Sequence, residues 1–178
     1  MKKLTLLVLA LGLLPVGTLA AQNTANGTLA ITATLQSCIY LTLENATGGI
    51  ALTNASTPAA TMALGNVSAY GGTVPTGVTK ALVGTPATAF TLSTAFGVKV
   101  AQFNAGAGTG YSLTAALQNA DTTNTWTVDT KTLSTTAVAV TGGTGYGNIV
   151  SHAFILSIPT TEAGGSISNT INLIATQL

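Results

Sequence analysis

Charged residues are almost absent from this chain of 178 residues. Only 5% of its residues are charged, against about 25% in an average soluble domain, and its cations are five lysines with no arginine. Proteins that bind nucleic acids neutralise phosphates with clusters of Lys and Arg, so this composition excludes nucleic acid as a partner. Because 47% of the residues are hydrophobic, the chain is also too apolar for an intrinsically disordered protein.

Residues that perform catalysis or bind metals are equally scarce, with one His, one Cys and four acidic residues. Protein zinc sites need three or four His, Cys or carboxylate ligands, and no serine lies in a Gly-x-Ser-x-Gly nucleophile elbow. His152 lies in an alternating apolar stretch, which predicts a buried or edge histidine with a backbone partner. We expect Asp121 and Asp129 to act in turns and caps. The chain is therefore predicted to be no enzyme and to use no cofactor.

Two further features have structural interpretations. The run Gly142–Gly147 is glycine-rich, but no Lys-Ser/Thr pair follows it, so a flexible hairpin is favoured over a phosphate-binding loop. Cys38 is the only cysteine, and it is either buried and inert, reactive, or bonded to a second chain. Packing as a small hydrophobic residue is the commonest of these fates.

The N-terminus has the pattern of a secretory signal peptide. Two lysines follow Met1, an apolar run extends from Leu4 to Gly17, and small residues follow up to Ala21. The run is too short to span a bilayer comfortably, so residues 1–20 are predicted to be removed during export. The remaining chain has three lysines and four carboxylates, and such a weakly charged surface favours association with other molecules. No later stretch is long and apolar enough to form a membrane span.

The rest of the chain alternates between apolar and polar residues with a period of two, which is typical of β-strands. The alternation over 29–43 is longer than one usual strand, so two extended segments that join near Gln36 and Ser37 are predicted there. Ser112–Ala120 is the one segment with helical character, and a strand followed by a turn is favoured for it. Further strands are predicted over residues 90–100, 111–117, 126–128, 133–140, 150–158 and 167–175, with weaker ones at 50–53, 61–64 and 67–70.

Turn residues separate these segments at intervals of about 8–15 residues, a spacing typical of β-sandwiches. We therefore predict an all-β, immunoglobulin-like β-sandwich over residues 37–178, preceded by an N-terminal extended segment, residues 21–36. Trp126 is predicted to lie in the core, because aromatic residues dominate the packing of such sandwiches.

Both ends of the chain resemble one protein family. The stretch Gly27–Cys38, GTLAITATLQSC, is similar to the mature N-terminus of spore coat protein U-like and archaic chaperone–usher pilin subunits. The ending Glu162–Ala175, EAGGSISNTINLIA, is similar to the terminal strand of that family, and ALGNVS at 63–68 resembles a short family motif. The family usually pairs its early cysteine with a second one, which this chain lacks.

The resemblance implies a mechanism of assembly. Such subunits have an incomplete immunoglobulin-like sandwich, and the N-terminal segment of a neighbour supplies the missing strand by β-augmentation. Leu29, Ile31, Ala33 and Leu35 point to one side of the extended segment and suit this donor role. The alternative is that the segment forms the first strand of its own complete domain.

The sequence thus predicts an exported structural subunit of a pilus, fibre or surface coat, located in the periplasm in transit and then on the cell surface. It would form a homo-oligomer or polymer by strand addition, with a periplasmic chaperone and an outer-membrane usher as further partners. The alternative is a self-contained surface or adhesion domain that binds glycan or protein. A secreted hydrolase is a distant third, because an acid/base cluster is missing.

Overall fold

The computed structural model describes residues 28–34, 38–103 and 110–178, so the predicted export signal and Leu35 lie outside the described residues. The chain divides into two units, Met1–Thr34 and Leu35–Leu178, which are described separately. In the first unit, residues 28–34 carry no assigned helix or strand. The second unit has nine β-strands and no helix among its described residues, and no membrane-spanning helix occurs in this described part.

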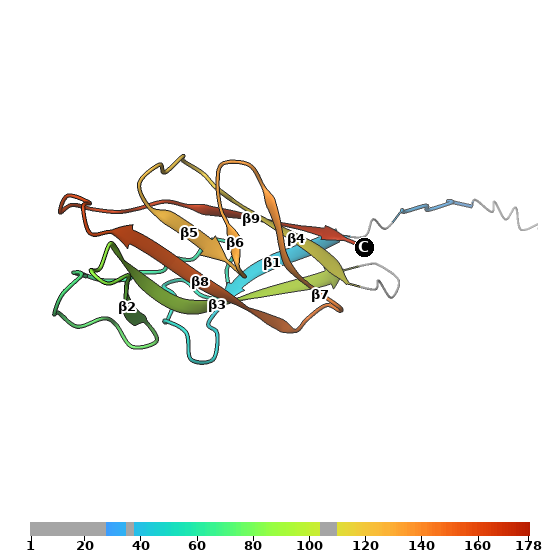
Figure 1. Ribbon diagram of the computed structural model, residues 1–178. Coiled ribbons are helices and arrows are strands. Elements are labelled where there is room, and N and C mark those ends of the chain that lie inside the picture. The colour runs from blue at the N-terminus through green and yellow to red at the C-terminus, as the bar shows by residue number, and fades with distance from the viewer. Residues whose placement is uncertain (1–27, 35–37, 104–109) are drawn as a thin grey trace, which may run out of the picture. The chain divides into compact units, whose positions relative to one another are not determined.

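Two antiparallel sheets build the second unit (Figure 1). The larger sheet has the order β1-β3-β8-β5-β6, and β2 pairs with the first half of the long strand β3. The smaller sheet has the order β7-β4-β9. The strands are β1 (Cys38–Glu44), β2 (Thr79–Val83), β3 (Ala89–Phe103), β4 (Tyr111–Leu117), β5 (Thr125–Val128), β6 (Lys131–Thr132), β7 (Val138–Gly143), β8 (Ile149–Pro159) and β9 (Ile171–Gln177). The predicted all-β class and two-sheet sandwich are confirmed.

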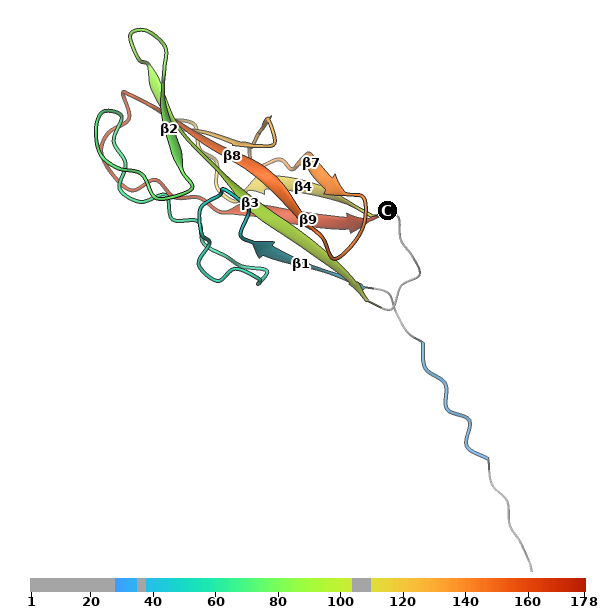
Figure 2. The same ribbon diagram turned by 90° about the horizontal axis from the view of Figure 1, so that it is seen from below.

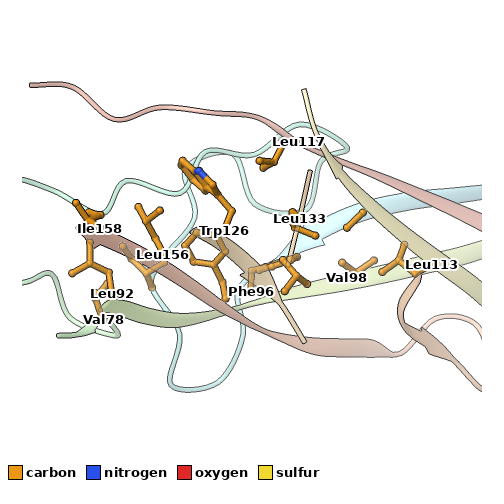
Figure 3. Packing of buried hydrophobic residues seen from close by; sticks show 14 of the residues in the cluster. Val78, Leu92, Phe96, Val98, Leu113, Leu117, Trp126, Leu133, Leu156 and Ile158 are labelled. Carbon is orange, nitrogen blue, oxygen red and sulfur yellow. The ribbon is translucent and has the colours of Figure 1, made fainter. Parts of the chain in front are cut away.

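The alternation along β3 and β8 places apolar side chains on the inner face of the larger sheet. Phe90 pairs with Ile158 and Leu92 pairs with Leu156 across the ladder, and all four are buried. Buried residues of β4 in the smaller sheet face them, and buried residues of β5 lie beside them in the larger sheet and complete the core (Figure 3). Trp126, which is 6% exposed, lies among them, so its predicted core position is confirmed.

Several predicted strands match the observed ones closely. Residues 111–117 form β4 with the predicted bounds, and the segments predicted at 90–100, 126–128 and 150–158 correspond to β3, β5 and β8. The strand predicted at 167–175 begins only at Ile171, as β9. The second half of the long N-terminal alternation forms β1, which begins at Cys38. The favoured interpretation of Ser112–Ala120 as a strand and turn is also correct.

Other predictions are wrong. The strand expected over 133–140 starts only at Val138, and Leu133 is buried in the core between β6 and β7, where its amide donates to the carbonyl of Trp126. The weak strands at 50–53 and 61–64 reduce to one isolated bridge, Thr53 with Thr61, and 67–70 forms neither a strand nor a bridge. Strand β2 was not predicted. The glycine run after Thr141 is no hairpin, because it joins β7 in one sheet to β8 in the other.

Candidate assembly site

The core is open along one side of the sandwich. Strand β1 is an edge of the larger sheet, β9 is an edge of the smaller sheet, and the two edges lie side by side (Figure 2). Side chains that point inward from β3, β4 and β8 are nearly all buried, but those from β1 and β9 are only partly buried. We call this strip the trench. Its partly buried apolar residues are Ile39, Leu41, Leu43, Leu52, Met62, Leu64, Ile167, Ile171, Leu173 and Ala175.

Two adjoining hollows deepen the trench. The first has a volume of about 500 Å³, and its walls include Leu43, Met62 and Leu173, with Trp126 and Phe154 also lining it. The indole and phenyl rings of these last two residues pack together at 6.1 Å.

The second hollow, also about 500 Å³, extends past the start of β9. It is lined by Phe90, Leu92 and Ile158. It shares Leu64 and Ile167 with the first hollow. The two hollows therefore adjoin each other, and the second, whose lining also includes polar residues of the segments 66–68 and 160–166, runs beyond the first residue of β9.

The outer edge of β9 has no strand partner among the described residues. On the side of β9 that faces β4, the amide of Gln118 donates to the carbonyl of Thr170, and the amide of Leu178 donates to the carbonyl of Gly110. In an antiparallel ladder such hydrogen-bonded pairs alternate with residues whose N–H and C=O point away. The backbone groups of Ile171, Leu173, Ala175 and Gln177 therefore face outward beside the trench, as a template for another strand.

The other two sheet edges are protected against such pairing. The edge strand β6 has only two residues, carries Lys131, and follows two residues with positive φ, Asp129 and Thr130. The pairing register of the edge strand β7 with β4 is irregular. In addition, the amide of Thr141 on β7 donates to the Asp129 carboxylate and is not available to another strand. Short strands, charges and bulges are the devices by which sheets avoid edge-to-edge contact. Strand β9 is seven residues long, uncharged, and has none of them.

Of the predicted donor residues, Leu29, Ile31 and Ala33 belong to the first unit, and Leu35 lies outside the described residues. The side chains of Leu29 and Ile31 are exposed, as is that of Ala33. Sequence reasoning singled out this segment but missed the trench, because the trench combines residues from β1, 52–67 and β9. The only signal for it in the sequence is the uncharged alternation of β9 itself.

His152 is fully buried, with 0% exposure, and its ring stacks on Phe96 at 5.4 Å. Its Nδ1 lies 2.7 Å from Oδ2 of Asp129, so its partner is a carboxylate and the predicted backbone partner is wrong. A carboxylate only accepts, so Nδ1 carries the proton. Nε2 is buried and has no hydrogen-bond partner among the described residues. A general base must reach its substrate, and this nitrogen lies inside the core.

Asp121 caps its own turn and anchors the floor of the trench. Its carboxylate accepts hydrogen bonds from the amides of Thr123 and Asn124, from the Asn124 side chain and from Nε1 of Trp126 at 2.7 Å. Burial raises the pKa of Asp121, but these donors outweigh it and hold the pKa at about 2. The predicted turn role of Asp121 is confirmed.

Cys38 is exposed, so the expectation that it packs as a small hydrophobic residue is wrong. Among the described residues, no group of three His, Cys, Asp or Glu side chains gathers in a way that could hold a metal ion.

The fold and the trench together define an all-β sandwich with one open side. Comparisons with protein-family models and with curated proteins found no match to the chain.

Proposed function

We propose that this chain is an exported structural subunit of an extracellular pilus, fibre or surface coat, and that its copies assemble by strand addition. The N-terminal segment of one copy, residues 21–36, would lie in the trench of the next copy and pair with the outer edge of β9. The observation that carries this proposal is the apolar trench beside an unprotected strand edge.

The strand order supports an immunoglobulin-like arrangement with one strand missing. In that fold one sheet has the order A-B-E-D, and the other contains C, F and G. The order β1-β3-β8-β5 fits A-B-E-D, while β4 and β9 fit C and F. Strand G would pair with F, at the edge of β9 that has no described partner. A donor segment would take the place of G.

The donor segment matches the acceptor in length and chemistry. The donor positions from Leu29 to Leu35 span seven residues, as many as β9 has, and neither stretch carries a charge. Leu29, Ile31, Ala33 and Leu35 would enter the trench, where each large aliphatic side chain contributes about 1.5–3 kcal/mol when fully buried. Main-chain hydrogen bonds to β9 would add affinity that does not depend on sequence.

This proposed function requires no catalysis, which agrees with the complete burial of the His152 ring in the core.

Before assembly, the trench would expose apolar surface and invite aggregation. A periplasmic chaperone that fills it, and an outer-membrane usher that exchanges chaperone for donor segment, are therefore proposed as further partners. The resulting contact runs head to tail and generates a fibre instead of a closed ring.

The test compares two variants of the full mature chain. Ile31→Asp places a carboxylate in the trench, which costs several kcal/mol, and should leave the protein monomeric. Thr32→Asp adds the same charge on the opposite side of the segment and should assemble like the wild type. Sedimentation velocity and negative-stain microscopy measure assembly, and the fluorescence of Trp126 reports whether each variant is folded.

Two outcomes would contradict the proposal. If the wild type shows no oligomers at any concentration, strand addition does not occur. If Ile31→Asp unfolds an isolated monomer, the segment is a strand of its own domain, and a self-contained surface or adhesion domain becomes the better interpretation.

A further inference from the structure

We infer that Lys80 is a positioning residue of the assembly site. Its ammonium group holds the extended segment 62–71 in place as a second wall of the trench, beside the start of β9. This inference rests on the proposed function, in which the donor segment of a second copy lies in the trench. Lys80 would act in this way whichever direction the donor segment takes along β9.

Two stretches of chain line both hollows of the trench. Residues 60–65 and 167–171 line the first hollow, and residues 64–69 and 162–167 line the second. Leu156, which is buried in the core, also lines both hollows. A strand that pairs with the start of β9 would therefore lie against the first of the two stretches as well.

The segment 62–71 has the alternation of a strand but belongs to no sheet. Its partly buried apolar side chains pack against the core, and they are Met62, Leu64, Val67 and Ala69. The alternation shifts by one residue at Gly65, whose φ of +75° favours glycine. Among the described residues, the backbone of residues 62–67 makes no hydrogen bond. Apolar packing, which has no preferred direction, is therefore all that fixes this part of the wall.

Lys80 supplies the polar anchor of the wall. In the ladder of β2 with β3, Lys80 pairs with the buried Leu92, so its stem points toward the same side of the sheet. Its Nζ donates to the carbonyl of Ser68 at 2.9 Å and to that of Gly71. Within the part of the chain that the structure describes, these are the only hydrogen bonds that join residues 62–74 to the rest of the sandwich. Hydrogen bonds from a charged donor are about twice as strong as neutral ones.

The position of the wall controls how well the trench accepts a donor. Without the ammonium group of Lys80, the segment 62–71 keeps its apolar contacts but loses its anchor, so the trench would be ready for a strand only part of the time. The affinity of a ligand falls with the fraction of the protein that can bind it. Residues 27–36 carry no charge, so Lys80 does not attract the donor directly and acts through the wall.

The first test measures how tightly the trench binds a peptide of residues 27–36 with blocked ends. The acceptor is the full mature chain with Ile31→Asp, which is expected to stay monomeric. Lys80→Met keeps a long apolar stem but removes the hydrogen-bond donors, and it should weaken binding about tenfold or more. Lys80→Arg restores a charged donor and should recover most of the affinity. Lys99→Met removes the same charge between the buried residues of β3, from the outer face of the larger sheet, and should bind like the parent.

The unfolding of the same proteins in urea, followed by the fluorescence of Trp126, separates positioning from stability. The midpoints should be similar for all four, because water can reach the exposed residues Ser68 and Gly71 when Lys80 is replaced. An unchanged affinity of Lys80→Met, or a loss of affinity that is matched by an equal loss of unfolding free energy, would overturn the inference. Failure of the peptide to bind the parent would refute strand addition itself.

Hydrogen exchange tests the wall directly. The amides of residues 62–67 have no partner among the described residues, so they should exchange fast in the acceptor without peptide. They should exchange more slowly once the peptide is bound, whereas the amides of β7, at the far edge of the smaller sheet, should not change. Slower exchange in β9 without any change in residues 62–67 would refute the second wall and leave strand addition intact.

Discussion

The Asp129 carboxylate joins both sheets, so its removal should destabilise the whole sandwich. It lies in the turn between β5 and β6 and accepts from Nδ1 of His152 at 2.7 Å, from the amide of Ala153 at 3.0 Å and from the amide of Thr141 at 3.2 Å. His152 and Ala153 belong to β8 in the larger sheet, whereas Thr141 belongs to β7 in the smaller one. Asp129→Ala leaves all three donors without this acceptor.

The magnitude follows from the burial of these donors. A buried donor without a partner costs about 1–3 kcal/mol, and His152 is fully buried, whereas Thr141 and Ala153 are exposed residues that water can reach. We expect Asp129→Ala to lower the free energy of unfolding by about 2–4 kcal/mol. Asp129→Asn keeps the shape and tolerates the positive φ of 47°, so its smaller loss isolates the contribution of the charge.

The effect should depend on pH. Burial raises the pKa of Asp129, but the hydrogen bond and charge of His152 and the bonds to Thr141 outweigh it, so the pKa lies below its ordinary value. The stabilisation is therefore complete above the pKa of an unfolded aspartate, about 4, and is lost as the pH falls through the lowered pKa of the folded state. The wild type and Asp129→Asn should converge in stability over this acidic range.

Urea denaturation, followed by the fluorescence of the single Trp126, measures all three proteins between pH 3 and pH 8. Losses below about 0.5 kcal/mol for both variants, the range of ordinary surface substitutions, would refute the view that Asp129 holds the sheets together. A difference between wild type and Asp129→Asn that grows toward low pH would refute the argument on charge.

Three further outcomes are expected. Trp126→Ala should cost about 3–5 kcal/mol, as large aromatic truncations do, and native wild-type emission at the wavelength of water-exposed tryptophan would contradict its burial. Cys38→Ser should leave the melting temperature of the monomer nearly unchanged, and a large drop in the wild-type melting temperature on adding reductant would reveal a covalent dimer. Gly77→Ala should destabilise severely, because a Cβ there would meet the carbonyl oxygen of Gly49 at 2.2 Å at a φ of +83°; calorimetry showing an unchanged melting temperature would contradict this.

The sequence predicts the strands whose alternation is regular and whose ends are marked by turn residues. The buried faces of β3 and β8 could be predicted, because Phe90, Leu92, Phe154 and Leu156 occupy alternating apolar positions, whereas the pairing of the two strands could not. Strand β2 was missed because its residues are mostly exposed and carry no alternation. The strand predicted over 133–140 is too long, because β-branched and apolar residues also occur outside strands. Leu133, for example, is buried in the core but lies outside a strand.

Contacts between distant segments were beyond the reach of sequence patterns. The partnership of Asp129 with His152 depends on the β5–β8 ladder, which places the turn after Val128 beside β8. The trench depends on the meeting of two strands from different sheets, and a period of two along each strand contains no information on that meeting. The donor residues Leu29, Ile31, Ala33 and Leu35 could be named from sequence alone, and their role stays a prediction.

The position of β4 in the middle of the smaller sheet has a consequence for how fast the chain reaches its native state. Its partner β9 lies far along the chain, as the 64-residue separation of the bonded pair Ser112 and Thr176 illustrates. Closing such long loops is entropically costly, and proteins rich in distant pairings fold in milliseconds to seconds. The β4–β9 ladder is therefore expected to form late. Substitutions within it should accelerate unfolding while they leave the refolding rate almost unchanged.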